Sequence, residues 1–126
     1  MKTCVDTEGT LCLLLAYGKI RVPVSSIAMI RGDGNYSKIY QTNGKEFLSS
    51  FTLGLFVRFL NPCRQFFLVN KGLVLNMDHV GRIVKKDCGL FAEMRNGERH
   101  PLSRRRSRKV LDYLQLHGIG IQMDTL

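Results

Sequence analysis

The sequence lacks the residue patterns on which most enzymes and metalloproteins depend. Its four cysteines contain no CxxC pair and have no histidine at ligand spacing, so the spacing of a zinc site is absent. The three histidines lie far apart, and none has a nucleophile beside it. The 10 acidic residues are too few and too dispersed to indicate a two-metal site. The stretch GDG is followed by NYS rather than by Gly-Lys-Ser/Thr, so it predicts a turn and not a P-loop. We therefore expect no enzyme, no bound metal and no cofactor.

Long hydrophobic runs are also missing. The longest apolar stretch, Leu11 to Ala16, is far too short to cross a bilayer. The N-terminal residues MKTCVDTEGT have no apolar run after their lysine, which argues against a signal peptide. Because nothing indicates secretion, the cysteines are expected to be reduced thiols in a cytoplasmic protein. They are Cys4, Cys12, Cys63 and Cys88.

Positive charge is what the sequence has in excess. Lysine and arginine number 19 against 10 acids, a formal net charge of +9 on 126 residues. Such a charge points to a polyanionic partner, with nucleic acid as the first candidate and an anionic membrane surface as the second. Five basic residues fall between positions 104 and 109, at the start of a predicted helix. A basic run is about as often plain solvated surface as a binding site. Arginines in a first helical turn, however, oppose the helix dipole, and this unfavourable placement favours a function in binding an anion.

Most of the chain is predicted to form short strands separated by turns. In KIRVPV, apolar residues alternate with Arg21 and Pro23, and Pro23 places this strand at a sheet edge because it cannot donate a ladder hydrogen bond. Asn43-Gly44 predicts a hairpin with a type I′ turn, and Asn96-Gly97 predicts a second hairpin. Gly18-Lys19 separates the first two strands. The predicted strands cover residues 11–17, 20–24, 27–31, 36–41, 45–49, 66–69, 73–75, 79–84, 89–94 and 98–102.

Two helices are predicted between these strands. Thr52 is a suitable N-cap for a short helix that ends at Asn61-Pro62. Ser103 is expected to cap a last helix, for which Gly118 is the stop. With no linker or internal repeat, the chain is predicted to be a single mostly-β domain over residues 1–126. Its core spans about 11–116, and its tail, 117–126, gives no clear structural prediction.

Four segments in this order and spacing carry a resemblance to a known family: VPVSSI, GDGNYSKIYQTNGKEFLSSFTLG, FFLVNKGLVLNMDHV and PLSRRRSRKVL. From about Leu11 to Leu114 the chain resembles the LytTR DNA-binding domain of bacterial response regulators. The resemblance implies an elongated fold of short antiparallel sheets with two short helical segments. It also implies sequence-specific binding of double-stranded DNA by loops that enter successive major grooves, as in a transcriptional regulator. Family members usually carry a receiver or membrane segment N-terminally. Here 10 residues precede the first predicted strand, so this chain is expected to be a stand-alone domain.

The resemblance assigns three groups of DNA-binding residues. The first contacting loop of the family matches Asn35 to Lys38, so Tyr36, Ser37 and Lys38 would face DNA. The second loop matches Asn70, Lys71 and Gly72, and the third matches the start of the last helix. The residues assigned to DNA are Asn35, Tyr36, Ser37, Lys38, Asn70, Lys71, Arg104, Arg105 and Arg108.

The second loop departs from the family's usual sequence. Here Leu68 stands in place of an arginine, Asn70 in place of a histidine and Gly72 in place of a serine. Asn70 can still hydrogen-bond a base edge, preferably adenine. Two other functions stay open: an interaction module that antagonises a full regulator, and nonspecific polyanion binding. The expected partners are duplex DNA with repeated sites, a second copy on DNA or a partner regulator, and no membrane.

Overall fold

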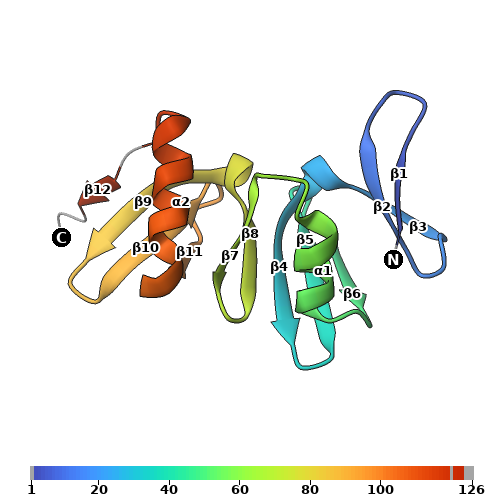
Figure 1. The fold of residues 1–126 in the computed structure, drawn as a ribbon, viewed down its shortest axis with the longest axis horizontal. Helices are drawn as coiled ribbons and strands as arrows, with labels where there is room; N and C mark the ends of the chain where they lie inside the picture. The colour runs from blue at the N-terminus through green and yellow to red at the C-terminus, as the bar shows by residue number, and fades with distance from the viewer. Residues whose placement is uncertain (1, 120, 124–126) are drawn as a thin grey trace. The chain divides into compact units, whose positions relative to one another are not determined.

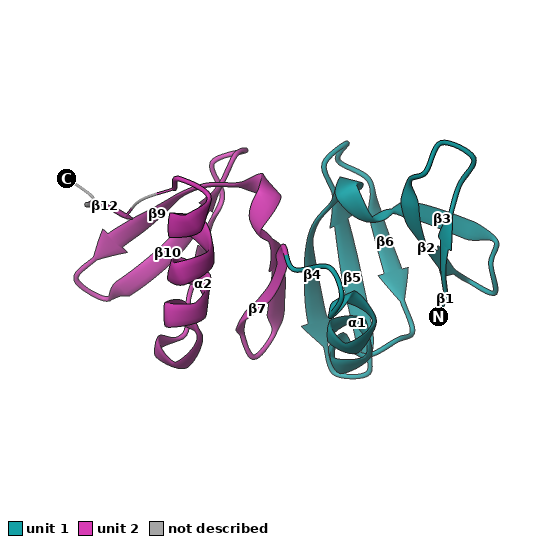
Figure 2. Ribbon diagram, turned by 45° about the horizontal axis from the view of Figure 1, so that its top comes forward, with its two compact units in different colours: residues 1–64 teal, residues 65–126 magenta. Residues whose placement is uncertain are grey.

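The chain forms mostly β-strands with two α-helices, in a computed structural model that describes residues 2–119 and 121–123 (Figure 1). Its residues divide into two compact units, Met1–Arg64 and Gln65–Leu126 (Figure 2). The predicted fold class, short antiparallel sheets with two helical segments, is confirmed. None of the helices in these described ranges is long and apolar enough to span a membrane.

The first unit begins with an antiparallel sheet in the order β1-β2-β3. These strands are β1 (Lys2–Val5), β2 (Leu11–Leu15) and β3 (Ile20–Pro23). Pro23 ends an edge strand, as predicted. The predicted strand over 11–17 ends at Leu15, because Ala16 and Tyr17 take positive φ angles of 51° and 59° and begin the turn. Strand β1 was not predicted, because its four residues are mostly exposed and show no alternation of apolar and polar positions.

A second antiparallel sheet segment and a helix complete the first unit. In chain order its elements are η1 (Val24–Ser26), β4 (Ile27–Asp33), β5 (Tyr36–Gln41), β6 (Glu46–Ser49) and α1 (Leu53–Leu60). Helix α1 begins as predicted, with the hydroxyl of Thr52 accepting a hydrogen bond from the Leu55 N–H at 3.3 Å. The helix lies against β4 so closely that a Cβ on Gly32 would come within 2.9 Å of the Leu53 Cβ. The first glycine of GDG therefore serves packing rather than a turn.

The turn types of the Asn-Gly hairpins differ from the prediction. Gly44 has a φ of 85°, but Asn43 does not take a positive φ, so the turn is not type I′. Instead, the Gly44 N–H donates to the Gln41 carbonyl at 3.1 Å and the Gln41 N–H donates to the Lys45 carbonyl at 2.9 Å. This is a three-residue loop, a tight turn followed by glycine in the left-handed conformation. The loop at Gly97 has the same hydrogen bonds.

The second unit consists of a hairpin, a sheet and the longer helix. The hairpin strands are β7 (Phe66–Asn70) and β8 (Leu73–Asn76), followed by η2 (Met77–His79), where His79 had been predicted to start a strand. The sheet has the order β11-β10-β9-β12, formed by β9 (Val80–Lys86), β10 (Gly89–Met94), β11 (Arg99–Pro101) and β12 (Ile121–Met123). Strand β12 pairs in parallel with β9 and lies in the tail, whose structure was not predicted.

Helix α2 (Arg104–Leu116) rests on the β7 side of the second unit. Val110 and Leu114 are buried, and the Tyr113 ring lies 5.1 Å from the Phe67 ring, measured between centroids. At its C-terminus the Gly118 N–H donates to the Gln115 carbonyl, and the next N–H donates to the Leu114 carbonyl. This Schellman arrangement, with Gly118 at a φ of 79°, confirms the predicted stop.

Candidate nucleic-acid interface

The polar cluster between Gly32 and Lys38 is the turn and first half of a hairpin. Asp33 pairs with Tyr36 across β4 and β5, which leaves Gly34 and Asn35 as a two-residue turn. Gly34 has a φ of 59° and Asn35 does not take a positive φ, a pattern that fits a type II′ turn with glycine first. Asn35 and Tyr36 are both exposed. The hairpin thus presents Asn35 at its tip and Tyr36 just below.

The alternation of strand β5 separates its residues into an outer and an inner face. Tyr36 and Lys38 point to the outer face, whereas Ser37 and Ile39 are completely buried. The Ser37 hydroxyl donates to the Phe51 carbonyl at 2.8 Å. The expectation that Ser37 would face DNA is therefore wrong. Its hydroxyl instead ties β5 to the segment that leads into α1.

Replacing Ser37 by alanine should lower stability without removing a DNA contact. The change removes the completely buried Ser37 hydroxyl and its hydrogen bond to the half-buried Phe51 carbonyl, which costs about 0.5–1.5 kcal/mol of unfolding free energy. Urea denaturation measures the loss, and Ser50→Ala, at an exposed position next to Phe51, is the control. A Ser37→Ala variant that unfolds at the wild-type urea concentration would contradict this role.

Lys38 is held on the outer face by an acidic neighbour. Its Nζ lies 2.8 Å from a Glu46 carboxylate oxygen on β6 and 5.5 Å from the centre of the Tyr40 ring. The hydrogen bond and the negative charge of Glu46 raise the pKa of Lys38, so the amine stays charged. The two side chains are 43% and 48% exposed, and ion pairs this open to water are weak. A phosphate can therefore replace Glu46 as the partner of Lys38 at little cost.

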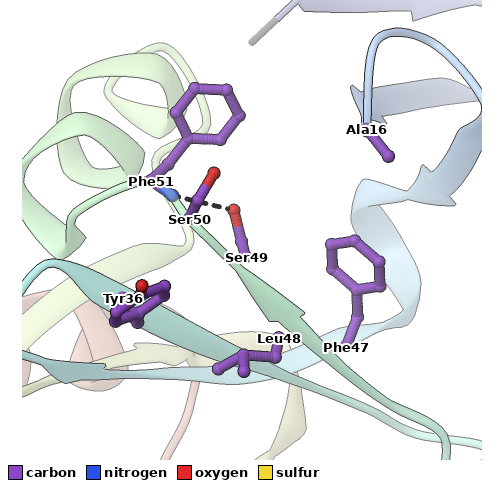
Figure 3. Close-up of a pocket in the computed structure, with 7 residues that line it drawn as sticks. All are labelled: Ala16, Tyr36, Phe47, Leu48, Ser49, Ser50 and Phe51. Carbon is purple, nitrogen blue, oxygen red and sulfur yellow. Dashed lines mark hydrogen bonds between the residues drawn. The ribbon is translucent and has the colours of Figure 1, made fainter.

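A hollow in the surface lies beside Tyr36 (Figure 3). It has a volume of about 260 Å³, and Leu48 and Phe51 also line it. Tyr36 is 54% exposed and Leu48 is 64% exposed, so the outer face carries apolar as well as charged groups. The Ser49 hydroxyl accepts a hydrogen bond from the Phe51 N–H at 3.1 Å, which fixes the chain at the rim (Figure 3).

The amide of Asn70 is engaged at both of its ends. Its Oδ1 accepts a hydrogen bond from the Gly72 N–H at 3.0 Å, which closes the β7–β8 turn. Its Nδ2 donates to the Pro101 carbonyl at 3.0 Å. A backbone bond from the Ser103 N–H to the Val69 carbonyl, at 2.8 Å, lies next to it. The structure thus brings the second predicted loop and the start of α2 together within one unit.

Lys71 stands exposed at the tip of this turn, next to Gly72. Gly72 does not take a positive φ, and a Cβ built there would meet only the Asn70 Oδ1, at 3.9 Å. Neither the backbone nor the space around it requires glycine. A serine, the residue that the resemblance leads one to expect here, would fit without strain.

The start of α2 presents a group of basic side chains. Arg104, Arg105 and Arg108 are exposed, while Arg106 is half-buried towards the face that carries Val110. The helix has no acidic residue in its first turn, and the Ser103 side chain makes no capping hydrogen bond. Ser103 occupies the predicted N-cap position without acting as a side-chain cap. The helix start is consequently strongly positive, which suits an anion.

Comparison with known proteins gives the family of the chain. The family model of the LytTr DNA-binding domain matches residues 17–115. The chain belongs to this family.

One similar solved structure is the LytTr DNA-binding domain of a protein described as a methyl-accepting/DNA response regulator from Bacillus cereus. It shares 20% sequence identity and a TM-score of 0.66, and the match covers 83% of this chain and 95% of that one. At this identity the likeness supports the fold. No curated protein matches the chain.

Sequence reasoning missed two features of this LytTr domain. The first is the ion pair of Lys38 with Glu46, which the predicted hairpin could have indicated. Its register sets Tyr40 opposite Glu46, so Lys38 is the diagonal neighbour of Glu46. The Pro101 carbonyl, the partner of Asn70, has no such signal, because the two residues are 31 positions apart in the chain. In the described residues, no group of three or more His, Cys, Asp or Glu side chains could hold a metal ion.

Proposed function

We propose that this LytTr domain recognises specific sites in double-stranded DNA and acts in transcriptional regulation. Loops enter successive major grooves in this proposal. The first unit contributes Asn35, Tyr36 and Lys38 from the β4–β5 hairpin. The second unit contributes the Lys71 turn and the start of α2, with Asn70 as a positioning residue. The arginines proposed to contact DNA are Arg104, Arg105 and Arg108.

The observation that carries the proposal is the joined arrangement of the Lys71 turn and the α2 start. Two hydrogen bonds, from Asn70 to Pro101 and from Ser103 to Val69, hold these segments together. Each presents exposed cations, and arginines at a helix start act against the dipole. A fold that holds such unfavourable charges in a defined place is better suited to binding a polyanion than to leaving them solvated by water alone. Family membership selects DNA as that polyanion.

Duplex binding should depend steeply on salt. Lys38, Lys71, Arg104, Arg105 and Arg108 count as five phosphate neighbours, which at about −0.9 each gives a slope of about −4 to −5 for log K against log salt. Fluorescence anisotropy with a labelled duplex over several salt concentrations measures the slope. A slope near zero would remove the electrostatic basis of the proposal.

Specificity is tested by selecting binding sites from random duplex DNA and then competing the selected site against scrambled DNA. A specific binder should prefer its site by about a thousandfold or more. Equal competition by both duplexes would instead support nonspecific polyanion binding. If no site is enriched and the chain co-purifies with another regulator, the interaction-module function would replace this one.

Substitutions of the two partners of the Lys38–Glu46 ion pair should change DNA affinity in opposite directions. Lys38→Ala should weaken binding to all sequences about equally and reduce the magnitude of the salt slope by about one. Glu46→Gln removes the competing carboxylate, so it should strengthen binding to the same duplexes. Affinities of both variants are measured on the selected and the scrambled site. If Glu46→Gln leaves affinity unchanged while Lys38→Ala lowers it, the phosphate does not compete with Glu46.

A further inference from the structure

Two cysteines face each other across the first sheet. The antiparallel register of β1 and β2 sets Cys4 directly opposite Cys12. Residues directly opposite in such a pair project to the same side of the sheet, with neighbouring side chains. Cys12 is only 1% exposed, whereas Cys4 is half-buried and therefore partly exposed to solvent. The pair thus consists of one accessible and one covered thiol.

The turn between these strands defines the geometry of the pair. The Asp6 N–H donates to the Thr10 carbonyl at 3.0 Å, while the Thr10 N–H donates to the Asp6 carboxylate at 2.9 Å. The backbone bond from Asp6 places Asp6 and Thr10 at a hydrogen-bonded position of the ladder. Because such pairs alternate along an antiparallel ladder, the Cys4–Cys12 pair two positions further on is hydrogen-bonded as well, with Cα atoms about 5.5 Å apart. This separation is within the commonest range for disulfides.

The distance between the two Cβ atoms bears on how readily a disulfide here would be reduced. Facing Cβ atoms in antiparallel strands lie about 4.5–5.5 Å apart, slightly more than the roughly 3.5–4.5 Å of a disulfide. A bond between these sulfur atoms therefore requires the strands to tighten locally. Strained disulfides are the ones that small thiols reduce readily.

We propose that Cys4 and Cys12 are a reversible oxidation site that a low-molecular-weight disulfide converts to an intramolecular cross-strand disulfide. The Cys4 thiolate attacks one sulfur of the small disulfide and releases the other half as a thiolate. The Cys12 thiol loses its proton to solvent and attacks the Cys4 sulfur of the mixed disulfide, which releases the second half. Two protein thiols are oxidised, and one small disulfide is reduced to two thiols.

The environment of each thiol sets the order of these steps. Cys4 is accessible, so it meets the small disulfide first. Burial raises the pKa of Cys12, and the nearby Asp6 carboxylate and Cys4 raise it further, so Cys12 is a poor first nucleophile. The other two cysteines, Cys63 and Cys88, lie outside this sheet. The disulfide would fasten the exposed edge strand β1 to β2.

Mass spectrometry of the full chain tests this directly. The reduced protein is incubated with oxidised glutathione, alkylated with iodoacetamide in denaturing urea so that buried thiols also react, and digested with trypsin. The peptide 3–19, which contains both cysteines, should lose two hydrogen atoms and take up no alkyl group. Dithiothreitol should restore two alkylatable thiols. These readouts involve no DNA, so they are independent of the proposed function.

Two variants complete the experiment. In Cys63→Ser/Cys88→Ser the bond should form as in the wild type. In Cys4→Ser, a change at a half-buried position of an edge strand, peptide 3–19 should keep an alkylatable Cys12. The proposal is overturned if wild-type Cys4 stays alkylatable, stops at a stable glutathione adduct, or joins a Cys88 of another molecule.

Discussion

Replacing Arg104 and Arg105 together by alanine should weaken duplex binding strongly and leave the protein at least as stable as before. Both side chains are exposed in the first turn of α2, where their charge opposes the helix dipole. Removing such a cation relieves about 0.3–1 kcal/mol, and alanine is the best helix former. Most substitutions that impair function also destabilise, so this combination would mark the arginines as functional.

The loss of binding has two parts. Two lost phosphate contacts reduce the magnitude of the salt slope by about two units. A residue that also reads a base contributes about 1–3 kcal/mol on the preferred site, roughly 5- to 150-fold in affinity. Titrations of the selected and scrambled duplexes at two salt concentrations separate the two parts, and urea denaturation reports stability.

Matched variants distinguish these arginines from positive charge in general. Lys85→Ala/Lys86→Ala removes the same charge from exposed positions at the end of β9. It should change affinity far less. Arg105→Lys keeps the charge but loses the planar fork, so it should retain the salt slope and lose site preference if Arg105 reads a base. If the lysine pair costs as much affinity as the arginine pair, net charge alone explains binding.

The hairpins of this fold were predictable because their signals are local. Asn-Gly pairs and glycine turns located the hairpins other than the one formed by β1 and β2, although the turn type depends on how many residues the loop contains. Strands β1 and β12 were missed for a different reason. β12 pairs in parallel with β9, whose paired residues lie 38 positions earlier in the chain, so no local pattern indicates it. Pairing, rather than propensity, makes these segments strands.

In the candidate site, too, local features were predictable from the sequence and long-range contacts were not. Ser37 lies two residues from Ile39, so the period of a strand already placed both side chains on one face, and a buried Ile39 implies a buried Ser37. Resemblance to the family's contacting loop outweighed that signal in the prediction. Asn70 is different, because only the folded chain brings its amide to the Pro101 carbonyl.

Replacing Asn70 by alanine should destabilise the second unit by about 1–3 kcal/mol. The substitution removes both hydrogen bonds of the amide, to the Gly72 N–H and the Pro101 carbonyl, each worth about 0.5–1.5 kcal/mol net. Asn70→Asp separates the two bonds in a stability measurement. The Asp carboxylate still accepts from the Gly72 N–H but cannot donate to the Pro101 carbonyl. Asn70→Asp should therefore recover only the part of the unfolding free energy that the bond to Gly72 contributes.

The DNA-binding result decides whether Asn70 positions the loop or reads a base. In the positioning role, Asn70→Ala releases the Lys71 turn from the start of α2. Affinity for the selected and the scrambled duplex should then fall by a similar factor. In the base-reading role, expected from the sequence, the loss of about 1–3 kcal/mol falls on the selected site alone, and preference relaxes at one base pair. The two internal hydrogen bonds favour the first outcome, because an amide that reads adenine needs both its donor and its acceptor. A loss confined to the selected site would show that Asn70 exchanges these partners for a base on binding, and that the bonds of the free protein only hold the side chain ready.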